Sequence, residues 1–208
     1  MQILHLDASI HGEKSVSRQL TAALVQALSE AVPQTAVVHR DLVASPIAHL
    51  DPAIAAGFRD VGDPPSDAAT AAERARSEAL VTELLDSDVL GIGAPMYTFA
   101  VPSQLTAWID RIVQPGRTFQ YAPTGAIGKA TGIRAVIASS RGGVYGPALA
   151  TLLDFQEDYL RAVLGFIGIR DVRFLRAEGV KGPEGRLSIE RALQSAPEVA
   201  KSLLESRG

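Results

Sequence analysis

Short apolar runs rich in β-branched residues alternate along the chain with longer stretches of helical periodicity, and this alternation constrains the fold more than any other feature. Parallel strands joined by crossover helices produce such a pattern. Strands are expected near Ile3–Leu6, Thr35–His39, Val89–Gly93, Ile133–Ala138 and Val172–Leu175. Helices are expected near Ser17–Ala31, Ala69–Asp86, Pro102–Val113, Pro147–Leu164 and Ser188–Ser206.

The five expected strands predict an α/β fold with a doubly wound, five-stranded parallel sheet and helices on both faces. The third and fourth runs, VLGIG and IRAVIA, carry no charge except Arg134, which is typical of strands covered on both faces. We expect the flavodoxin-like strand order 2-1-3-4-5 rather than a six-stranded dinucleotide fold. Residues 1–208 are expected to form one domain, in which Ala44–Asp67 is a surface excursion with a helical turn near Pro52–Phe58.

Charge and composition narrow the range of partners. The formal net charge of −3, from 20 basic and 23 acidic residues, leaves no positive excess for nucleic acid or an anionic membrane, so we expect neither as a partner. The chain has no cysteine, which excludes disulfides, thiolate metal sites and a catalytic thiol. The amino terminus MQILHLDASI does not have the pattern of a secretory signal, and no apolar run approaches the about 18 residues that a membrane span requires. We therefore expect a cytoplasmic protein with a small-molecule partner.

Ligands of open α/β sheets bind beyond the carboxyl ends of the strands, so the loops after the first, third and fourth strands form the candidate site. The first loop places Ser9, Ser15 and Ser17 beside the free amide donors of the following helix, which suits a phosphate group. Ser15 or Ser17 could instead serve only as the N-cap of that helix. Neither G-x-G-x-x-G nor G-x-x-x-x-G-K-[ST] occurs, so a monophosphate fits better than a dinucleotide or a nucleoside triphosphate.

The second loop, Ala94–Phe99, concentrates apolar and aromatic side chains directly after the third strand. Aromatic residues at a strand end usually enter the core, but a short loop with a proline makes it harder to bury Met96, Tyr97 and Phe99 together. These side chains could border a planar ring, with the backbone amides of the loop free to bond its polar edge.

The third loop, Ser139–Tyr145, contains the adjacent glycines Gly142 and Gly143. Such a pair marks a tight turn or a close approach of backbone to a ligand. Arg141 could be a surface charge or a donor near the polar edge of a ring. Each loop is weak evidence alone, and it is their meeting on one rim that indicates a site.

Other chemistries fit the sequence poorly. The histidines His5, His11, His39 and His49 show no paired-ligand spacing, so we expect no metal site and interpret His5 as a strand residue. No G-x-S-x-G elbow of a serine hydrolase occurs. A phospho-acceptor receiver domain would need an aspartate cluster at the ends of the first and third strands, where this chain has Asp7 and a proline.

The chain resembles the family of FMN-dependent NADH:quinone oxidoreductases and azoreductases in motifs that follow the family's order over nearly its whole length. These motifs are the Ser9 loop with its Ser15-Val16-Ser17 triplet, then APMYTFAVPSQLTAWIDRI, GRTFQY, SSRGGVY, and LGFIGIRDVRF with the following AEG. The resemblance implies a flavodoxin-like fold and a homodimer with FMN at the subunit interface. It also implies electron transfer from NADH or NADPH to a quinone or an azo compound.

The same resemblance assigns roles to individual residues. The FMN phosphate and ribityl chain would be held by Ser9, Ser15, Val16 and Ser17. The isoalloxazine would be held by Pro95, Met96, Tyr97, Thr98, Phe99, Ser140, Arg141, Gly142 and Gly143. The substrate pocket would be lined by Phe119, Tyr121, Tyr145 and by Phe166 of the partner subunit.

The chain departs from the family pattern at two positions. The family usually has asparagine where this chain has Thr98, and threonine lacks the paired donor and acceptor of an amide. A backbone contact to the flavin is therefore expected there, and whether the threonine side chain also bonds the flavin stays open. Ala126 stands where a proline is common, which would loosen the loop after Tyr121.

The resulting hypothesis is an FMN-dependent enzyme that transfers two electrons from NAD(P)H to quinones and reductively cleaves azo compounds by a ping-pong mechanism. No protein side chain is assigned as catalytic, because the flavin carries the chemistry. Two alternatives stay open: a flavodoxin-type carrier of single electrons and a non-catalytic flavin-binding module. The sequence does not distinguish NADH from NADPH, since no fingerprint loop is followed by a ribose-reading acidic residue.

Overall fold

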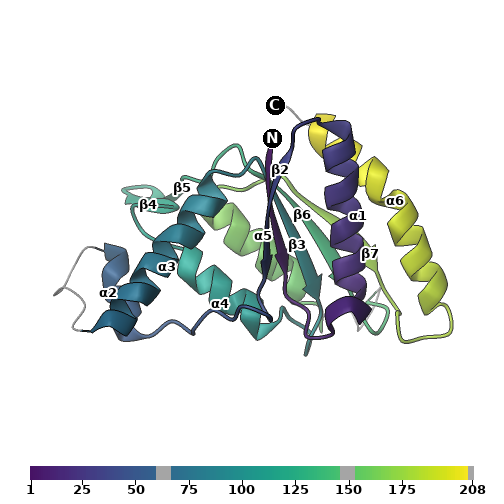
Figure 1. Cartoon of the computed structure of the whole chain (residues 1–208), viewed down its shortest axis with the longest axis horizontal. Coiled ribbons are helices and arrows are strands. Elements are labelled where there is room, and N and C mark those ends of the chain that lie inside the picture. Colours follow the sequence, from purple (N-terminus) through teal and green to yellow (C-terminus); the bar gives the residue numbers. More distant parts are fainter. Residues whose placement is uncertain (60–66, 146–152, 206–208) are drawn as a thin grey trace.

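The computed structural model describes residues 1–59, 67–145 and 153–205. A five-stranded sheet lies at its centre, with all neighbouring strands parallel and in the order β2-β1-β3-β6-β7 (Figure 1). The strands of this sheet are β1 Gln2–Asp7, β2 Ala36–Asp41, β3 Val89–Pro95, β6 Arg134–Ser140 and β7 Val172–Ala177. The predicted flavodoxin-like α/β architecture with a five-stranded parallel sheet is therefore confirmed.

Helices cover both faces of the sheet (Figure 1). Helices α1 and α6 pack on one face and bury residues such as Ile3, Leu24 and Leu203. Helices α3, α4 and α5 pack on the other face around Leu4, Ile92 and the fully buried Trp108. The helices are α1 Val16–Ala31, α2 Pro52–Ala56, α3 Ala68–Leu85, α4 Ser103–Ile112, α5 Gln156–Ile167 and α6 Gly185–Glu205, with 3-10 turns η1 Gly12–Lys14 and η2 Gly57–Arg59.

The predicted strand order 2-1-3-4-5 is corrected to 2-1-3-6-7, because the chain forms two additional short strands between β3 and β6. Strands β4 Phe119–Ala122 and β5 Gly125–Gly128 form a separate antiparallel hairpin. Each has only four residues, of which Phe119 alone is buried, so neither gives the long apolar run by which the other strands were predicted. Ala126, expected in a loosened loop, instead pairs with Tyr121 in this hairpin.

The sheet strands run further toward their carboxyl ends than predicted. Asp7, Pro95 and Ser140 were expected in loops, but each is the last residue of its strand. Backbone hydrogen bonds between neighbouring strands continue past the apolar run to a polar residue or a proline. A hydrophobicity pattern therefore underestimates the length of each strand. The candidate loops therefore begin one or two residues later than expected.

The predicted helix Pro147–Leu164 is wrong over residues 153–155, which precede the first residue of α5. Its first residues, 147–152, lie outside the described residues, and α5 itself begins only at Gln156. The acidic Glu157 and Asp158 occupy its first turn, where the helix dipole favours negative charge. The helix ends at Gly168, whose φ of 108° is left-handed. The predicted turn near Pro52–Phe58 is confirmed as α2 and η2.

Helix α1 approaches the sheet closely because β3 has glycine beneath it. A Cβ atom on Gly93 would lie 2.6 Å from Oδ1 of Asp7 and 2.6 Å from Oγ1 of Thr21. No side chain fits at such distances without displacing its neighbours. Within the part of the chain that the structure describes, no helix is both long and apolar enough to cross a membrane.

Candidate functional site

The carboxyl ends of β1, β3 and β6 open onto a pocket of about 480 Å³. This is the edge of an open α/β sheet where ligands bind. The structure thus brings the three predicted loops together around one cavity. Its lining residues are Ser9, His11, Lys14, Ser15, Val16, Pro95, Met96, Tyr97, Thr98, Phe99, Ser140, Gly142, Gly143, Tyr145, Val180 and Lys181.

The first loop turns at η1 and enters α1 through Ser15. The hydroxyl of Ser15 accepts a hydrogen bond of 3.3 Å from the backbone amide of Arg18, so the N-cap interpretation of Ser15 is confirmed. Ser15 also lines the pocket, as does Val16, so the start of α1 faces the cavity. Ser17 is fully buried and lies 3.1 Å from Ser15, Oγ to Oγ, but it does not itself line the pocket.

The second loop makes a tight reversal directly after β3. Tyr97 and Ala100 exchange two backbone hydrogen bonds of 3.0 Å, and the residues between them, Thr98 and Phe99, have φ values of 47° and 68°. Two positive φ values in a two-residue loop define a type I′ turn. The hydroxyl of Tyr97 accepts from the amide of Ile10 at 3.2 Å and lies 3.3 Å from the hydroxyl of Ser9. The first two loops are therefore bonded to each other.

The third loop is bonded to both of its neighbours. The amide of Met96 donates to the carbonyl oxygen of Ser140 at 2.8 Å. Beyond β6, the carbonyl oxygens of Arg141, Gly142 and Gly143 accept from amides of the segment that follows β7, residues 179–181. Neither glycine has a positive φ, so left-handed backbone is not the reason for their presence. These hydrogen bonds hold Val180 and Lys181 at the wall of the pocket.

Arg141 is neither a surface charge nor a lining residue of the pocket. Its side chain is 3% exposed, and the guanidinium is bound by Asp154 at 2.7 Å, Glu157 at 2.7 Å and Glu178 at 2.9 Å. Its Nε donates to the hydroxyl of Ser139 at 3.2 Å. The guanidinium is thus turned into the protein, where it joins the third loop to α5 and to the end of β7.

Three of the expected substrate-pocket residues form an aromatic cluster elsewhere. The ring of Phe119 lies 5.3 Å from that of Tyr121 and 4.7 Å from that of Phe166, centroid to centroid. None of the three lines the pocket, and the β4–β5 hairpin that carries Phe119 and Tyr121 lies away from the carboxyl ends of the sheet strands (Figure 1). Within one chain, only Tyr145 of the four expected residues borders the cavity.

Sequence reasoning missed four lining residues: His11, Lys14, Val180 and Lys181. Lys14 lies in the predicted first loop, where a cation beside a helix start would have been a usable signal for an anion site. Lys181 gave no such signal, because it lies after β7 and is held at the pocket by backbone hydrogen bonds to the third loop. None of the described lining residues is acidic. The two lysines and the start of α1 therefore suit a negatively charged ligand.

Arg18 connects the first loop to charged groups at the edge of the sheet. Its guanidinium lies 2.6 Å from a carboxylate oxygen of Asp41 and 3.7 Å from one of Asp7, and it also donates to the carbonyl oxygen of Ser9 at 3.5 Å. Burial acts to raise the pKa of Asp7, but His5, His39 and Arg18 outweigh it, so the pKa lies below its ordinary value. Asp7 is therefore a carboxylate at neutral pH.

Comparison with known proteins agrees with this geometry. A family model described as a flavodoxin-like fold matches residues 1–199. A protein of Ralstonia nicotianae named FMN-dependent NADH:quinone oxidoreductase is 55% identical over 197 residues, which cover 94% of this chain and 95% of the relative. A Xanthomonas euvesicatoria protein named FMN-dependent NADH:quinone oxidoreductase 2 is 58% identical over 185 residues, covering 88% of this chain and 86% of the relative.

Solved structures share the fold at lower identity. An FMN-dependent NADH-azoreductase from Bacillus anthracis, solved in complex with FMN, superposes with a TM-score of 0.88 at 21% identity and covers 98% of this chain and 99% of its own. At that identity the likeness concerns the fold alone. Taken with the full-length relatives at more than half identity, these findings show that the chain belongs to the family of FMN-dependent NADH:quinone oxidoreductases, enzymes with a flavodoxin-like fold.

Proposed function

We propose that the chain binds FMN in the pocket at the ends of β1, β3 and β6 and transfers two electrons from NADH or NADPH to quinones. The observation that carries the proposal is the convergence of the three loops on one cavity of about 480 Å³ whose described lining has cations and aromatic rings but no acid. A volume of this size is that of a site for a small molecule or cofactor.

One end of the pocket fits a phosphate group. The hydroxyls of Ser9 and Ser15 line it together with the start of α1, whose first amides have no partner within the helix. The ammonium group of Lys14, in the same loop, adds positive charge, whereas the side chain of Lys181 lies beside Gly142. In this assignment Ser17 supports the site from behind, since its buried hydroxyl lies 3.1 Å from that of Ser15.

The other end fits a planar ring with a polar edge. Residues 95–99 wrap one side through the type I′ turn, which fixes the directions of their backbone amides. Gly143 has no side chain to keep a ring away from the backbone, and Tyr145 lies beside it. Arg141 would act by holding this loop in place through its three carboxylates.

Bound FMN would supply the redox chemistry, accepting two electrons from a reduced nicotinamide and passing them to the acceptor. The chain's own contribution would be to bind and orient the flavin and to limit access to one open side of the ring. With one open side, donor and acceptor would have to occupy it in turn, which is a ping-pong sequence. Reductive cleavage of azo compounds is proposed for the same side, since it consumes electrons from the same source.

We also propose that two chains associate with their pockets near the interface. Several apolar side chains are exposed, among them Tyr121 at 73%, Phe155 at 58% and Ile127 at 47%. Phe166, at 40% exposed, packs against the buried ring of Phe119 and could reach the pocket of a second copy. Such an arrangement would complete the substrate pocket with residues that lie outside it in one chain.

Flavin binding is tested first. Purified protein should show flavin absorbance or bind added FMN with one equivalent per chain. Lys14→Gln should weaken FMN binding about tenfold, which corresponds to about 1.4 kcal/mol for one charged contact to phosphate. Lys201→Gln, an exposed lysine on α6, is the matched control and should leave the affinity unchanged. Absence of stoichiometric binding would overturn the proposal.

Turnover is tested second, with the FMN-loaded protein. Stopped-flow mixing with NADH and with NADPH should reduce the flavin, and subsequent mixing with a simple benzoquinone should reoxidise it. Steady-state rates are then measured at varied nicotinamide and fixed quinone concentrations. Parallel lines in double-reciprocal plots of these rates would support the ping-pong sequence, and intersecting lines would contradict it. An azo dye tests the cleavage reaction separately. A protein that keeps its FMN but is reduced by neither nicotinamide would be a binding module.

A further inference from the structure

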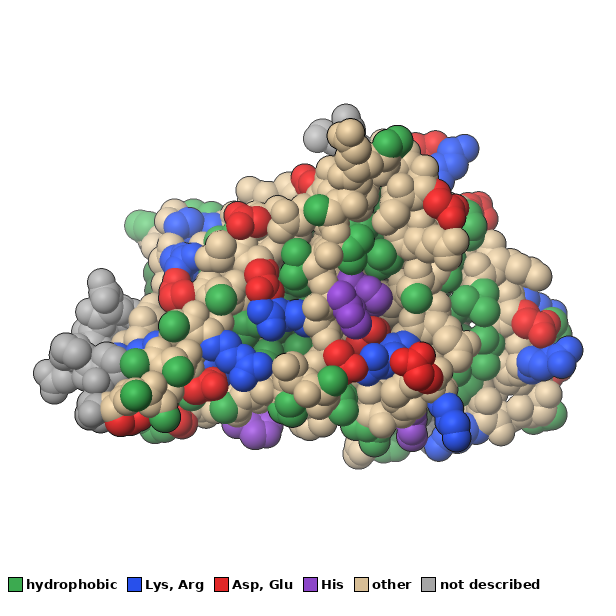
Figure 2. Space-filling model, viewed as in Figure 1, with side chains coloured by type: hydrophobic (Ala, Val, Ile, Leu, Met, Phe, Trp, Pro, Cys, Tyr) green, Lys and Arg blue, Asp and Glu red, His purple; other side chains and the backbone are tan. Residues whose placement is uncertain are grey.

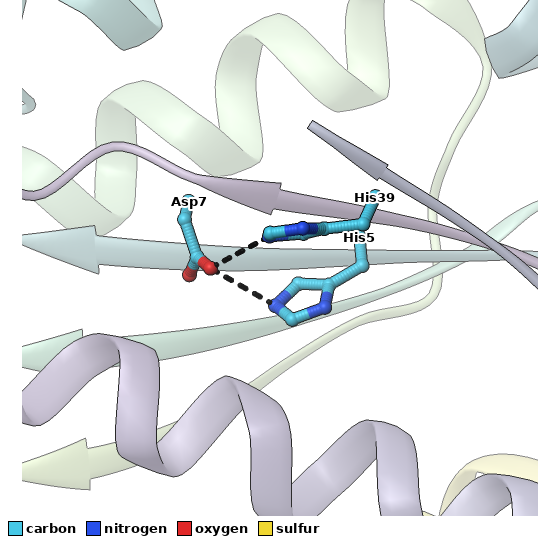
Figure 3. Close-up of side chains that lie close together, drawn as sticks. All are labelled: His5, Asp7 and His39. Carbon is cyan, nitrogen blue, oxygen red and sulfur yellow. Dashed lines mark hydrogen bonds and ion pairs between the residues drawn. The ribbon is translucent and has the colours of Figure 1, made fainter. Parts of the chain in front are cut away.

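Two histidines far apart in sequence lie side by side on adjacent strands. The parallel register of β1 and β2 places His5 opposite His39, and the two ring centroids are 4.6 Å apart. Asp7 follows His5 by two residues in the same strand, so its side chain is on the same face of the sheet. Figure 3 shows both imidazoles pointing toward the carboxylate of Asp7.

Three donor atoms converge in this cluster. Nε2 of His39 lies 2.9 Å from Oδ2 of Asp7, and Nε2 of His5 lies 3.5 Å from the same oxygen. The donor atoms of the three residues all lie within 4.8 Å of one another. Two donors on one tetrahedral zinc ion, each about 2.0–2.1 Å from the metal, are about 3.3 Å apart. Small side-chain rotations would therefore bring this set to the spacing of metal ligands.

Among the described residues, the polar atoms of this cluster are not all satisfied by hydrogen bonds. Oδ1 of Asp7 is buried and has no hydrogen-bond partner, and the buried Nε2 of His5 makes only the ionic contact of 3.5 Å with Oδ2 of Asp7. A buried polar atom without a partner is costly unless another group satisfies it. The side chain of His5 is 11% exposed, whereas that of His39 is 47% exposed. The cluster is thus buried on one side and open to solvent on the other.

We propose that His5, Asp7 and His39 form a binding site for a divalent transition metal ion of the zinc type. Two imidazole nitrogens and one carboxylate oxygen are a donor set that such ions prefer, whereas Ca²⁺ and Mg²⁺ prefer oxygen ligands. The half-exposed His39 leaves room for water as a fourth ligand and gives the ion a route from solvent. Histidine atoms reach the surface in the middle of the face shown in Figure 2, beside acidic and basic side chains.

The charge around the cluster permits a cation despite the nearby Arg18. The guanidinium of Arg18 is closer to Asp41, at 2.6 Å, than to Asp7, at 3.7 Å. Asp41 therefore provides the main counter-charge for Arg18, and the carboxylate of Asp7 stays available. An incoming ion would have to displace the longer contact of Arg18 and take the place of the direct contact of 2.9 Å between His39 and Asp7. Because metal and protons compete for imidazole nitrogens, binding should weaken at acid pH.

This site is separate from the proposed flavin pocket. None of its three side chains lines that pocket. Metal binding should therefore be the same in flavin-free and FMN-loaded protein, and failure of one proposal would leave the other standing.

The test uses the untagged full-length protein after removal of metals by a chelator. Zn²⁺ is titrated in competition with a chromophoric chelator, and one equivalent should bind. Co²⁺ provides a second readout, because four-coordinate Co²⁺ absorbs visible light far more strongly than six-coordinate Co²⁺. Absence of stoichiometric Zn²⁺ binding, or only the weak Co²⁺ spectrum, would overturn the proposal.

Matched variants locate the ion. His39→Gln should weaken Zn²⁺ binding tenfold or more, and this half-exposed position can be changed without opening the core. His49→Gln, an exposed histidine outside the cluster, should bind as the unaltered chain does. Asp7→Asn should also weaken binding, since an amide gives up the negative charge. Equal affinity in His39→Gln and His49→Gln would show that the ion lies elsewhere.

Discussion

Tyr97 and Ala100 are joined by two reciprocal backbone hydrogen bonds of 3.0 Å, which close a type I′ turn at the end of β3. Both residues inside the turn are left-handed, although neither is glycine, asparagine or aspartate. Left-handed backbone costs about 1–2 kcal/mol for an ordinary L-residue, and a β-branched residue such as Thr98 is among the least suited to it. The turn that borders the candidate pocket is therefore strained, as backbone at functional sites often is.

Replacement of Thr98 by asparagine should relieve part of this strain. Asparagine tolerates left-handed φ because its short amide bonds locally to the backbone. We expect Thr98→Asn to raise the free energy of unfolding by about 1 kcal/mol, measured by urea denaturation with an unchanged m-value. Thr98→Val keeps the branched Cβ and should show no gain. A loss of stability in Thr98→Asn would mean that the threonine side chain contributes more than its strain costs.

Substitution of Gly93 should disturb the contact between β3 and α1. A methyl group there would lie 2.6 Å from both Asp7 Oδ1 and Thr21 Oγ1, so Gly93→Ala should lower the free energy of unfolding by about 1–3 kcal/mol. Gly91→Ala is the matched control in the same strand, because its methyl group would lie 3.7 Å from Thr21 Cγ2, an ordinary contact. Equal losses in the two variants would refute the packing argument.

Removal of the guanidinium of Arg141 should leave Asp154, Glu157 and Glu178 without their shared cation. We expect Arg141→Met to reduce the free energy of unfolding by about 3 kcal/mol at neutral pH. Arg176→Met removes a guanidinium that also bonds Glu157 but is 45% exposed, and should cost less than about 1 kcal/mol. Chemical denaturation of both variants decides whether burial produces the difference.

The charge of Asp110 should lower the free energy of unfolding at neutral pH. Burial raises the pKa of this carboxyl above its ordinary value, and His49 opposes the shift only in part. The folded state therefore holds the proton more tightly than the unfolded chain, so stability falls as pH rises from about 3.9, the ordinary pKa of aspartate, through the raised value. Asp110→Asn should be more stable than the unaltered chain at pH 7, with the difference vanishing below about pH 4.

Tyr159 offers an independent readout of the same carboxylate. Burial raises the pKa of the Tyr159 phenol, and the charge of Asp110 raises it further. A spectrophotometric titration should therefore show a lower tyrosine pKa in Asp110→Asn. An unchanged titration curve would show that the two groups do not interact.

The parts of the fold that follow hydrophobic periodicity could be predicted, and the parts that follow pairing could not. The apolar runs of β1, β3 and β6 identified the strands, but backbone bonding carries each strand on to Asp7, Pro95 and Ser140, where no apolar pattern remains. The four-residue strands β4 and β5 were missed because they are defined by their pairing and neither contains a long apolar run.

The candidate site shows the same division. Ser9, Tyr97 and Gly142 belong to loops next to predicted strands, so sheet topology alone placed them together. Lys181 reaches the pocket through hydrogen bonds made after β7, which no local pattern reports. His5 and His39 are 34 residues apart, and only the register between β1 and β2 makes them neighbours.

Beyond the last paired residues of β6 and β7, backbone hydrogen bonds join the third loop to residues 179–181. Amides in such hydrogen bonds exchange with solvent only when that end of the sheet opens. We therefore expect the wall of the pocket to open together with that end of β6 and β7. A ligand arriving there meets backbone that is already ordered, so little of its binding energy is consumed in immobilising the wall.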